Sequence, residues 1–149
     1  MFESRESINL LGSVIANTNN ILLIFLFLSR IYKYPKLEYW LGIVFMLSIV
    51  PLTCMLIKAI ESKRAVIYFV QLSLMIAFIA VEFILDYLLK LEFRHNQNYV
   101  IPFLTLFYAS LGGMIGIAGQ SGKLWTVITV ITFLLMTMVS LIMHFRTNT

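Results

Sequence analysis

Long apolar blocks separated by short polar connectors constrain this chain more than any other feature of its sequence. Four blocks, at residues 37–60, 65–89, 100–119 and 124–145, are each mainly apolar over about 20 residues or more. An α-helix needs roughly 20 such residues to cross the ~30 Å hydrocarbon layer of a membrane. The sequence therefore predicts membrane-spanning helices, and the short connectors force neighbouring helices to run antiparallel.

The composition supports the same class of protein. Hydrophobic residues make up 60% of the 149 residues and charged residues 12%, whereas soluble proteins average about 45 to 50% and about 25%. We therefore expect a single integral membrane domain, residues 1–149, in contact with membrane lipids and located in the cell (inner) membrane. The net charge of +4 comes from Lys and Arg clusters between apolar blocks. This pattern suits lipid headgroups and argues against a nucleic-acid partner.

The first apolar block, residues 8–31, has an interrupted centre. It carries the run Asn17, Thr18, Asn19 and Asn20, and four successive helical residues cover the whole circumference of a helix. The dozen or so large apolar residues of the block favour insertion by roughly 4 to 7 kcal/mol, which unpaired amides at a few kcal/mol each could cancel. Asn17 and Asn20 share a face with Ser13 and could bond to a neighbouring helix, whereas Asn19 points elsewhere.

Two folds are compatible with this interrupted block. We predict an all-α integral membrane protein, an antiparallel bundle of five transmembrane helices at about residues 8–31, 37–60, 65–89, 100–119 and 124–145. The alternative has four spans, with an interfacial or broken N-terminal helix. Five crossings place five basic residues on one side and six on the other, whereas four crossings give seven against four. The distribution of basic residues therefore favours the alternative.

Acidic and amide side chains in the third block form a candidate ion or proton site. Glu82 and Asp86 lie one helical turn apart, and Gln71 lies three turns before Glu82 on the same face. An acid within a membrane span is a candidate functional group. The competing interpretation is an interfacial charge ladder that Lys90 and Arg94 continue beyond Asp86.

Small residues in the fourth block predict a close helix contact. They form a smooth strip with one GxxxG spacing, from Gly112 to Gly116, that permits two backbones to approach closely. The partner helix could belong to the same chain or to another copy. The strip consists of Ala109, Gly112, Gly113, Gly116 and Gly119.

The end of this strip, "GIAGQSGK", superficially resembles a phosphate-binding loop. Ile117 stands where the first glycine should be, Leu124 replaces the hydroxyl residue that would reach Mg²⁺, and an apolar helix precedes the segment. We therefore predict no nucleotide binding.

The fifth and second blocks carry features of helix packing. Hydroxyl side chains and one histidine follow a face of the fifth block, where they can bond to their own helix or to a neighbour. These residues are Thr126, Thr129, Thr137, Ser140 and His144. In the second block, Pro51 removes one backbone hydrogen bond and predicts a bend near residues 48–51, which could shape a cavity against the asparagines.

Neither a metal site nor a cofactor is expected. Cys54 is the only cysteine, and the two histidines, His95 and His144, lie near the ends of predicted helices. These positions do not suit a haem or a histidine-rich zinc site, and no nucleophile has a histidine beside it at membrane depth.

Three functional hypotheses follow from these features. The first is a non-enzymatic protein that acts through helix association, as a homo-oligomer or as the membrane subunit of a larger complex. The second is a small proton- or cation-linked transporter or channel that uses Glu82, Gln71, Asn17 and Asn20. The third is a membrane enzyme acting on lipid through Glu82 and Asp86.

Overall fold

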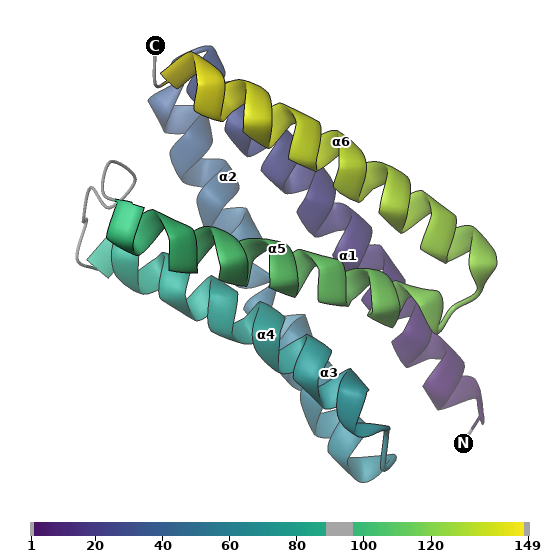
Figure 1. Cartoon of the computed structure of the whole chain (residues 1–149). Coiled ribbons are helices and arrows are strands. Elements are labelled where there is room, and N and C mark those ends of the chain that lie inside the picture. The colour runs from purple at the N-terminus through teal and green to yellow at the C-terminus, as the bar shows by residue number, and fades with distance from the viewer. Residues whose placement is uncertain (1, 89–96, 148–149) are drawn as a thin grey trace.

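The computed structural model describes residues 2–88 and 97–147, which form helices joined by short turns (Figure 1). Five helical segments are long and apolar enough to cross a membrane. This confirms the five-helix bundle. The helices are α1 (Phe2–Ile31), α2 (Pro35–Leu47), α3 (Ile49–Glu61), α4 (Val66–Phe83), the π-helix η1 (Ile84–Leu88), α5 (Gln97–Gly119) and α6 (Lys123–Thr147). The second span consists of α2 and α3, and the third of α4 and η1.

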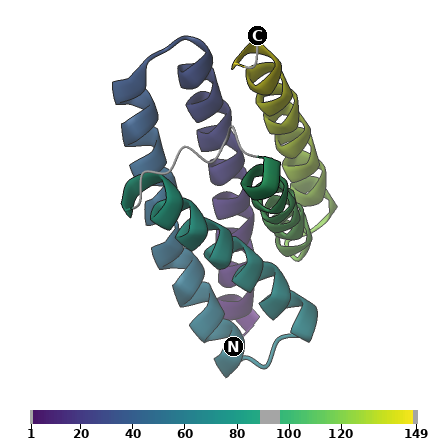
Figure 2. The ribbon, with the colours of Figure 1, turned by 60° about the vertical axis from the view of Figure 1, so that its left-hand side comes forward.

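The first span is one continuous helix, so the four-span alternative is wrong. α1 lies between the α2–α3 span and α6 (Figure 2) and packs most extensively against α6, α5 and α2. Because neighbours surround it over a wide arc, Asn17, Asn19 and Asn20 are all buried, and only Thr18 of the polar run is exposed. The distribution of basic residues favoured four spans because it does not reflect the burial of these asparagines by neighbouring helices.

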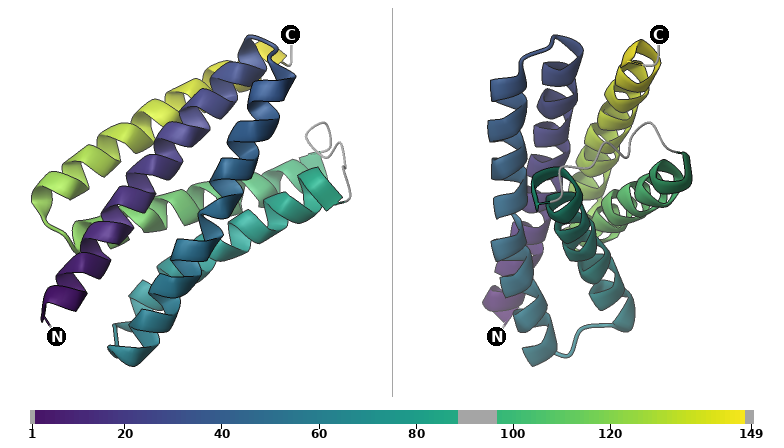
Figure 3. Two further views of the ribbon diagram at one scale, coloured as in Figure 1. Left: turned by 180° about the vertical axis from the view of Figure 1, so that it is seen from behind. Right: turned by 90° about the vertical axis from the view of Figure 1, so that its left-hand side faces the viewer.

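The termini of the bundle lie at opposite ends, as an odd number of spans requires (Figure 1). α1 and α6 run in the same direction, and their hydrogen-bonded residues advance together along both helices, from Asn17 and Thr129 to Asn20 and Thr132. α4 and α5 form an antiparallel pair that is inclined to α1 and α6 (Figure 3). The bundle therefore has an α1–α6 side and an α4–α5 side, with the α2–α3 span passing along both.

A chain of aromatic rings connects the helices through the apolar core. The ring of Phe78 on α4 lies 6.2 Å from that of Phe45 on α2 and 5.2 Å from that of Phe107 on α5, between centroids. Phe27 of α1 continues the chain at 6.0 Å from Phe107. The Phe27–Phe107 rings are tilted and the other two pairs are edge-to-face, and edge-to-face pairs stabilise a core beyond the area that they bury. Other fully buried side chains include Leu23, Leu52, Met55, Leu72, Met75, Leu111, Met114 and Met136.

The second span is interrupted at Ser48, where α2 ends and α3 begins. The Ser48 hydroxyl donates to the Phe45 carbonyl at 2.6 Å, and Pro51, three residues later, has no N–H to donate to the carbonyl of Leu47. The interruption therefore lies within residues 48–51, where the proline predicts a bend.

α1 and α3 end in the same way, each at a turn that contains a lysine. Lys33 and Lys63 both adopt positive φ angles, of 58° and 50°. Around Lys63, the Arg64 N–H donates to the Ala59 carbonyl and the Lys63 N–H to the Ile60 carbonyl, which is the Schellman pattern for capping a helix. Glycine usually fills this position because a Cβ is strained there.

Candidate functional site

A group of polar contacts joins the middle of α1 to α6. The Asn17 side-chain amide donates to the Thr129 hydroxyl at 2.9 Å, and the Asn20 amide donates to the Thr132 hydroxyl at 3.0 Å. The Thr132 hydroxyl lies 3.0 Å from Asn17 Oδ1, to which it can donate. We call these four residues the polar seam. Spacing of three residues on both helices brings the pairs into register.

A second group of contacts extends this interface towards the turn between α5 and α6. The Ser13 hydroxyl lies 2.8 Å from the Ser121 hydroxyl and 3.2 Å from the Ala118 carbonyl oxygen. The Asn9 amide donates to the Gln120 carbonyl at 3.4 Å. The structure therefore places Ser13, Asn17 and Asn20 on one face, and that face meets another helix.

The hydroxyl groups of the polar seam also bond within α6. Thr129 donates to the Trp125 carbonyl at 2.7 Å, and Thr132 lies 3.0 Å from the Thr129 carbonyl oxygen. Thr129 belongs to the predicted hydroxyl stripe, but Thr132 does not, because it lies off the 3.6-residue face that defined the stripe. The sequence signal that could have identified Thr132 is the three-residue spacing of Asn17 and Asn20. Two hydrogen-bonding residues three apart on α6, such as Thr129 and Thr132, match that spacing.

Asn19 differs from the other two asparagines. Its residue is only 1% exposed, yet neither its amide nitrogen nor its amide oxygen makes a hydrogen bond with the described residues. It lies on the face of α1 that also carries Gly12 and Leu26, seven residues away on either side. Asn19 therefore points into the apolar core between the α2–α3 span and α5, and does not face α6.

The predicted glycine strip is divided between two environments. Gln71 of α4 lies against Gly113 and Gly116, and its amide group fills the space that a side chain at position 116 would need. No atom lies within 4 Å of the space beside Gly112, and Ala109 is exposed. One edge of the strip thus packs within the chain, while the other faces outward.

Gly119, at the end of the strip, lies beside the α5–α6 turn. A side chain at position 119 would meet the Thr126 hydroxyl at 3.2 Å. Gly119 therefore belongs to the helix end and not to the outward edge.

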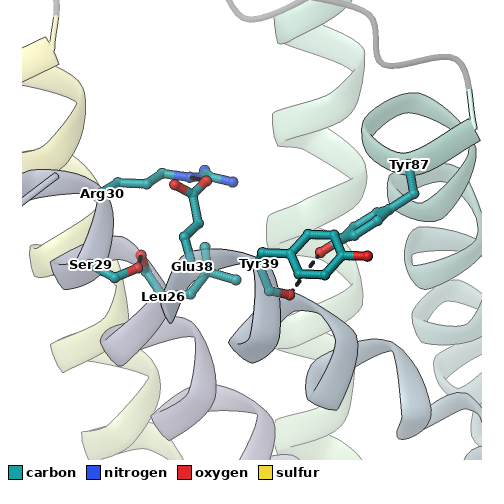
Figure 4. Close-up of polar contacts among 6 residues, drawn as sticks. All are labelled: Leu26, Ser29, Arg30, Glu38, Tyr39 and Tyr87. Carbon is teal, nitrogen blue, oxygen red and sulfur yellow. Dashed lines mark hydrogen bonds and ion pairs between the residues drawn. The ribbon is translucent and has the colours of Figure 1, made fainter. Parts of the chain in front are cut away.

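The acidic residues of the third span lie near an aromatic contact at the opposite end of the bundle. Glu82 is buried, at 6% exposure, and Asp86 lies in η1, where the helix widens. The hydroxyl of Tyr87 donates to the Tyr39 carbonyl at 3.3 Å (Figure 4) and occupies the space where a side chain at position 42 would lie. Gly42 thus allows the third span to approach the second. Lys90 and Arg94, the continuation of the predicted ladder, lie outside the described residues.

An ion pair lies beside this aromatic contact. Arg30 at the end of α1 faces Glu38 in the first turn of α2 across the α1–α2 turn (Figure 4). Both side chains are partly exposed, so the pair joins the two helix ends at the surface of the bundle.

The structure does not bring the predicted ion-site residues together. Asn17 and Asn20 contact α6, whereas Gln71 contacts α5. Glu82 lies eleven residues beyond Gln71, about 16 Å along the helix axis at 1.5 Å per residue. These residues form three separate polar positions.

Metal-ligating residues are dispersed in the described part of the chain, where no three His, Cys, Asp or Glu side chains could hold one ion. Cys54 is exposed on α3, and His95 lies outside the described residues.

Comparison with known proteins adds no further assignment. No protein-family model matches the chain, and neither a curated protein nor a solved structure gives a significant match.

Proposed function

We propose that this five-span membrane protein is non-enzymatic and acts by helix association within the lipid layer, and that it assembles with a second copy of itself. The observation that carries this proposal is the division of the α5 strip. Gly113 and Gly116 pack against Gln71 of the same chain, but Ala109 is exposed and the space beside Gly112 is open. Small residues that face lipid permit another helix to approach closely.

The outward surface has a definite extent. Thr105, Ala109 and Gly112 recur at intervals of four and three residues on the exposed or open side of α5, and we call them the outer strip. The Thr105 hydroxyl already donates to the Ile101 carbonyl at 2.8 Å, so it adds little polarity to the surface. The outer strip is therefore smooth and apolar, as a helix-packing surface in lipid should be.

The neighbouring edge of the α5 strip, at Gly113 and Gly116, carries the side-chain amide of Gln71. Gln71 is partly exposed, and its side chain makes no hydrogen bond with the described residues. Side-chain amides in membrane helices bond across helix contacts, and an amide is both donor and acceptor, so two copies related by a two-fold axis can pair with each other. This self-complementarity favours a second copy over a helix of another protein.

Energy transfer between labelled copies in liposomes tests the proposal. The wild-type protein should show transfer that rises with the protein-to-lipid ratio and then saturates. The double variant Ala109→Leu, Gly112→Leu should weaken association at least tenfold, because two leucine side chains separate the backbones. Ala77→Leu is the matched control, since Ala77 is exposed on α4, and it should leave the transfer unchanged.

Two outcomes would contradict the proposal. The wild-type protein could remain monomeric at every protein-to-lipid ratio. Alternatively, the outer-strip variant could associate as strongly as the wild type and the Ala77 control. Association of the wild type only after addition of another membrane protein would replace the second copy with that protein.

The burial of Glu82 favours a second candidate function, proton- or cation-linked transport. A carboxyl group at 6% exposure within a span can bind or release a proton only if its surroundings accommodate both states. Proton or cation flux into liposomes that Glu82→Gln abolishes would support this function. Glu61→Gln, at the exposed end of α3, is the control and should preserve the flux, whereas absence of flux in the wild type would reject this candidate.

A further inference from the structure

We propose that Asn19 and the interruption at Ser48 form a buried site for water, or for another small neutral molecule that both donates and accepts hydrogen bonds. Asn19 is 1% exposed, and both polar atoms of its side chain lack partners among the described residues. Buried polar groups in proteins are nearly always satisfied by protein or by ordered water. Asn19 therefore indicates a ligand within the core.

The register of α1 against the second span places Asn19 at the level of the interruption. Gly12 lies against Met55, and Leu26 lies against Gly42. Asn19 is midway between positions 12 and 26, and position 48 is midway between 55 and 42. The two antiparallel spans therefore bring Asn19 and Ser48 to the same depth.

The inward face of the second span also includes Ser48. Phe45 and Leu52 are fully buried, and Ser48 lies three residues after the first and four residues before the second. These spacings keep all three residues on one side of a helix. Ser48 is itself partly buried and lies on the side of the second span that faces α1, towards which Asn19 also points.

The interruption supplies groups that a small polar ligand could use. The Ser48 hydroxyl donates its hydrogen to the Phe45 carbonyl. Its oxygen can still accept a hydrogen bond from a ligand. Pro51 has no N–H, which leaves the Leu47 carbonyl without its helical donor. A water molecule needs two to four polar partners. Asn19, Ser48 and the interrupted backbone together meet that requirement.

The chemistry of these groups selects the ligand class. Asn19 offers both a donor and an acceptor, and neither Asn19 nor Ser48 carries a charge. A metal cation would be repelled by the amide hydrogens, and an anion would be repelled by the lone pairs of the serine oxygen. A neutral molecule with a hydroxyl group satisfies both kinds of partner, and water is the smallest such molecule.

Magnetisation transfer from water to ¹⁵N-labelled asparagine side chains, measured by solid-state NMR in lipid bilayers, tests this site. The side-chain amide of Asn19 should receive transfer, and Ser48→Ala should reduce it at least twofold. Asn17 is the internal control, because its amide donates to the Ser13 carbonyl and the Thr129 hydroxyl and should receive none. Asn19→Leu assigns the signal, and it should shift the midpoint of unfolding to lower denaturant concentration.

The wild-type spectrum decides the outcome even if a variant fails to fold. Absence of transfer to Asn19 in the wild type would overturn the proposal. Transfer that Ser48→Ala leaves unchanged would remove Ser48 from the site, and so would additive effects of Asn19→Leu and Ser48→Ala on the unfolding midpoint. Greater stability of Asn19→Leu than of the wild type would show that the amide is simply unsatisfied in a dry core.

Discussion

Replacement of Asn17 by leucine should destabilise the bundle by about 1 kcal/mol. The substitution removes two contacts to α6, the bond from Asn17 to Thr129 at 2.9 Å and that from Thr132 to Asn17 at 3.0 Å. Hydrogen bonds between membrane helices contribute about 0.6 kcal/mol on average and at most about 1.7 kcal/mol. The two bonds together give about 1.2 kcal/mol, which lowers the folded-to-unfolded ratio about eightfold. The loss should be no larger, because both threonines retain acceptors within α6.

Reversible unfolding in mixed micelles, followed by the fluorescence of Trp40 and Trp125, measures this loss. A double-mutant cycle with Thr129→Val should return a coupling of about 0.6 kcal/mol, the contribution of one such bond. Thr18→Leu is the matched control, because Thr18 is next to Asn17 but exposed. It should change the stability by less than about 0.5 kcal/mol.

Two results would refute this reasoning. If Asn17→Leu is as stable as the wild type and the cycle shows no coupling, the polar seam contributes nothing to the stability of the bundle. If the loss exceeds about 4 kcal/mol, more than twice the maximum for a single bond, the hydroxyl groups have no adequate alternative partners and the geometry of the seam is different.

Three further substitutions test other features of the bundle. Lys63→Gly should raise the unfolding midpoint and stabilise the protein by up to about 1 kcal/mol, because it relieves the positive φ at the end of α3; an unchanged or lower midpoint would count against this strain. Gly116→Val should destabilise by about 1 to 3 kcal/mol through overpacking against Gln71, and added Gln71→Ala should restore part of the stability in the same unfolding assay. Glu38→Gln should cost less than about 1 kcal/mol through loss of the ion pair with Arg30, and the difference from wild type should shrink in high salt.

Most of the fold was accessible from the sequence because the lipid layer sets the length of each span. The apolar blocks alone predict four spans. They predict α1 as a fifth span only if neighbouring helices bury its asparagines. The burial of Asn19 in the core of the bundle could not be predicted in this way. Helical periodicity showed that it points away from Asn17 and Asn20, but whether that direction meets lipid or protein depends on the position of α1 within the bundle.

The candidate site was less accessible because its residues come from distant parts of the chain. Asn17 and Thr129 are 112 residues apart, and periodicity within one helix does not show which faces meet. The same limitation affected Gln71, which was grouped with Glu82 because they share a helix face, although its contact is with the glycines of α5. Spacing identified the polar residues but not their partners.

The position of α1 explains how an apolar chain tolerates three asparagines at the centre of a span. Insertion of α1 alone is marginal, since the roughly 4 to 7 kcal/mol from its apolar residues is comparable to the cost of its unpaired amides. Two of those amides gain their partners outside α1 from α6, the last helix of the chain. The first and last spans are therefore coupled, because Thr129 and Thr132 of α6 supply the asparagines of α1 with partners from another helix, and α6 makes its most extensive contact with α1.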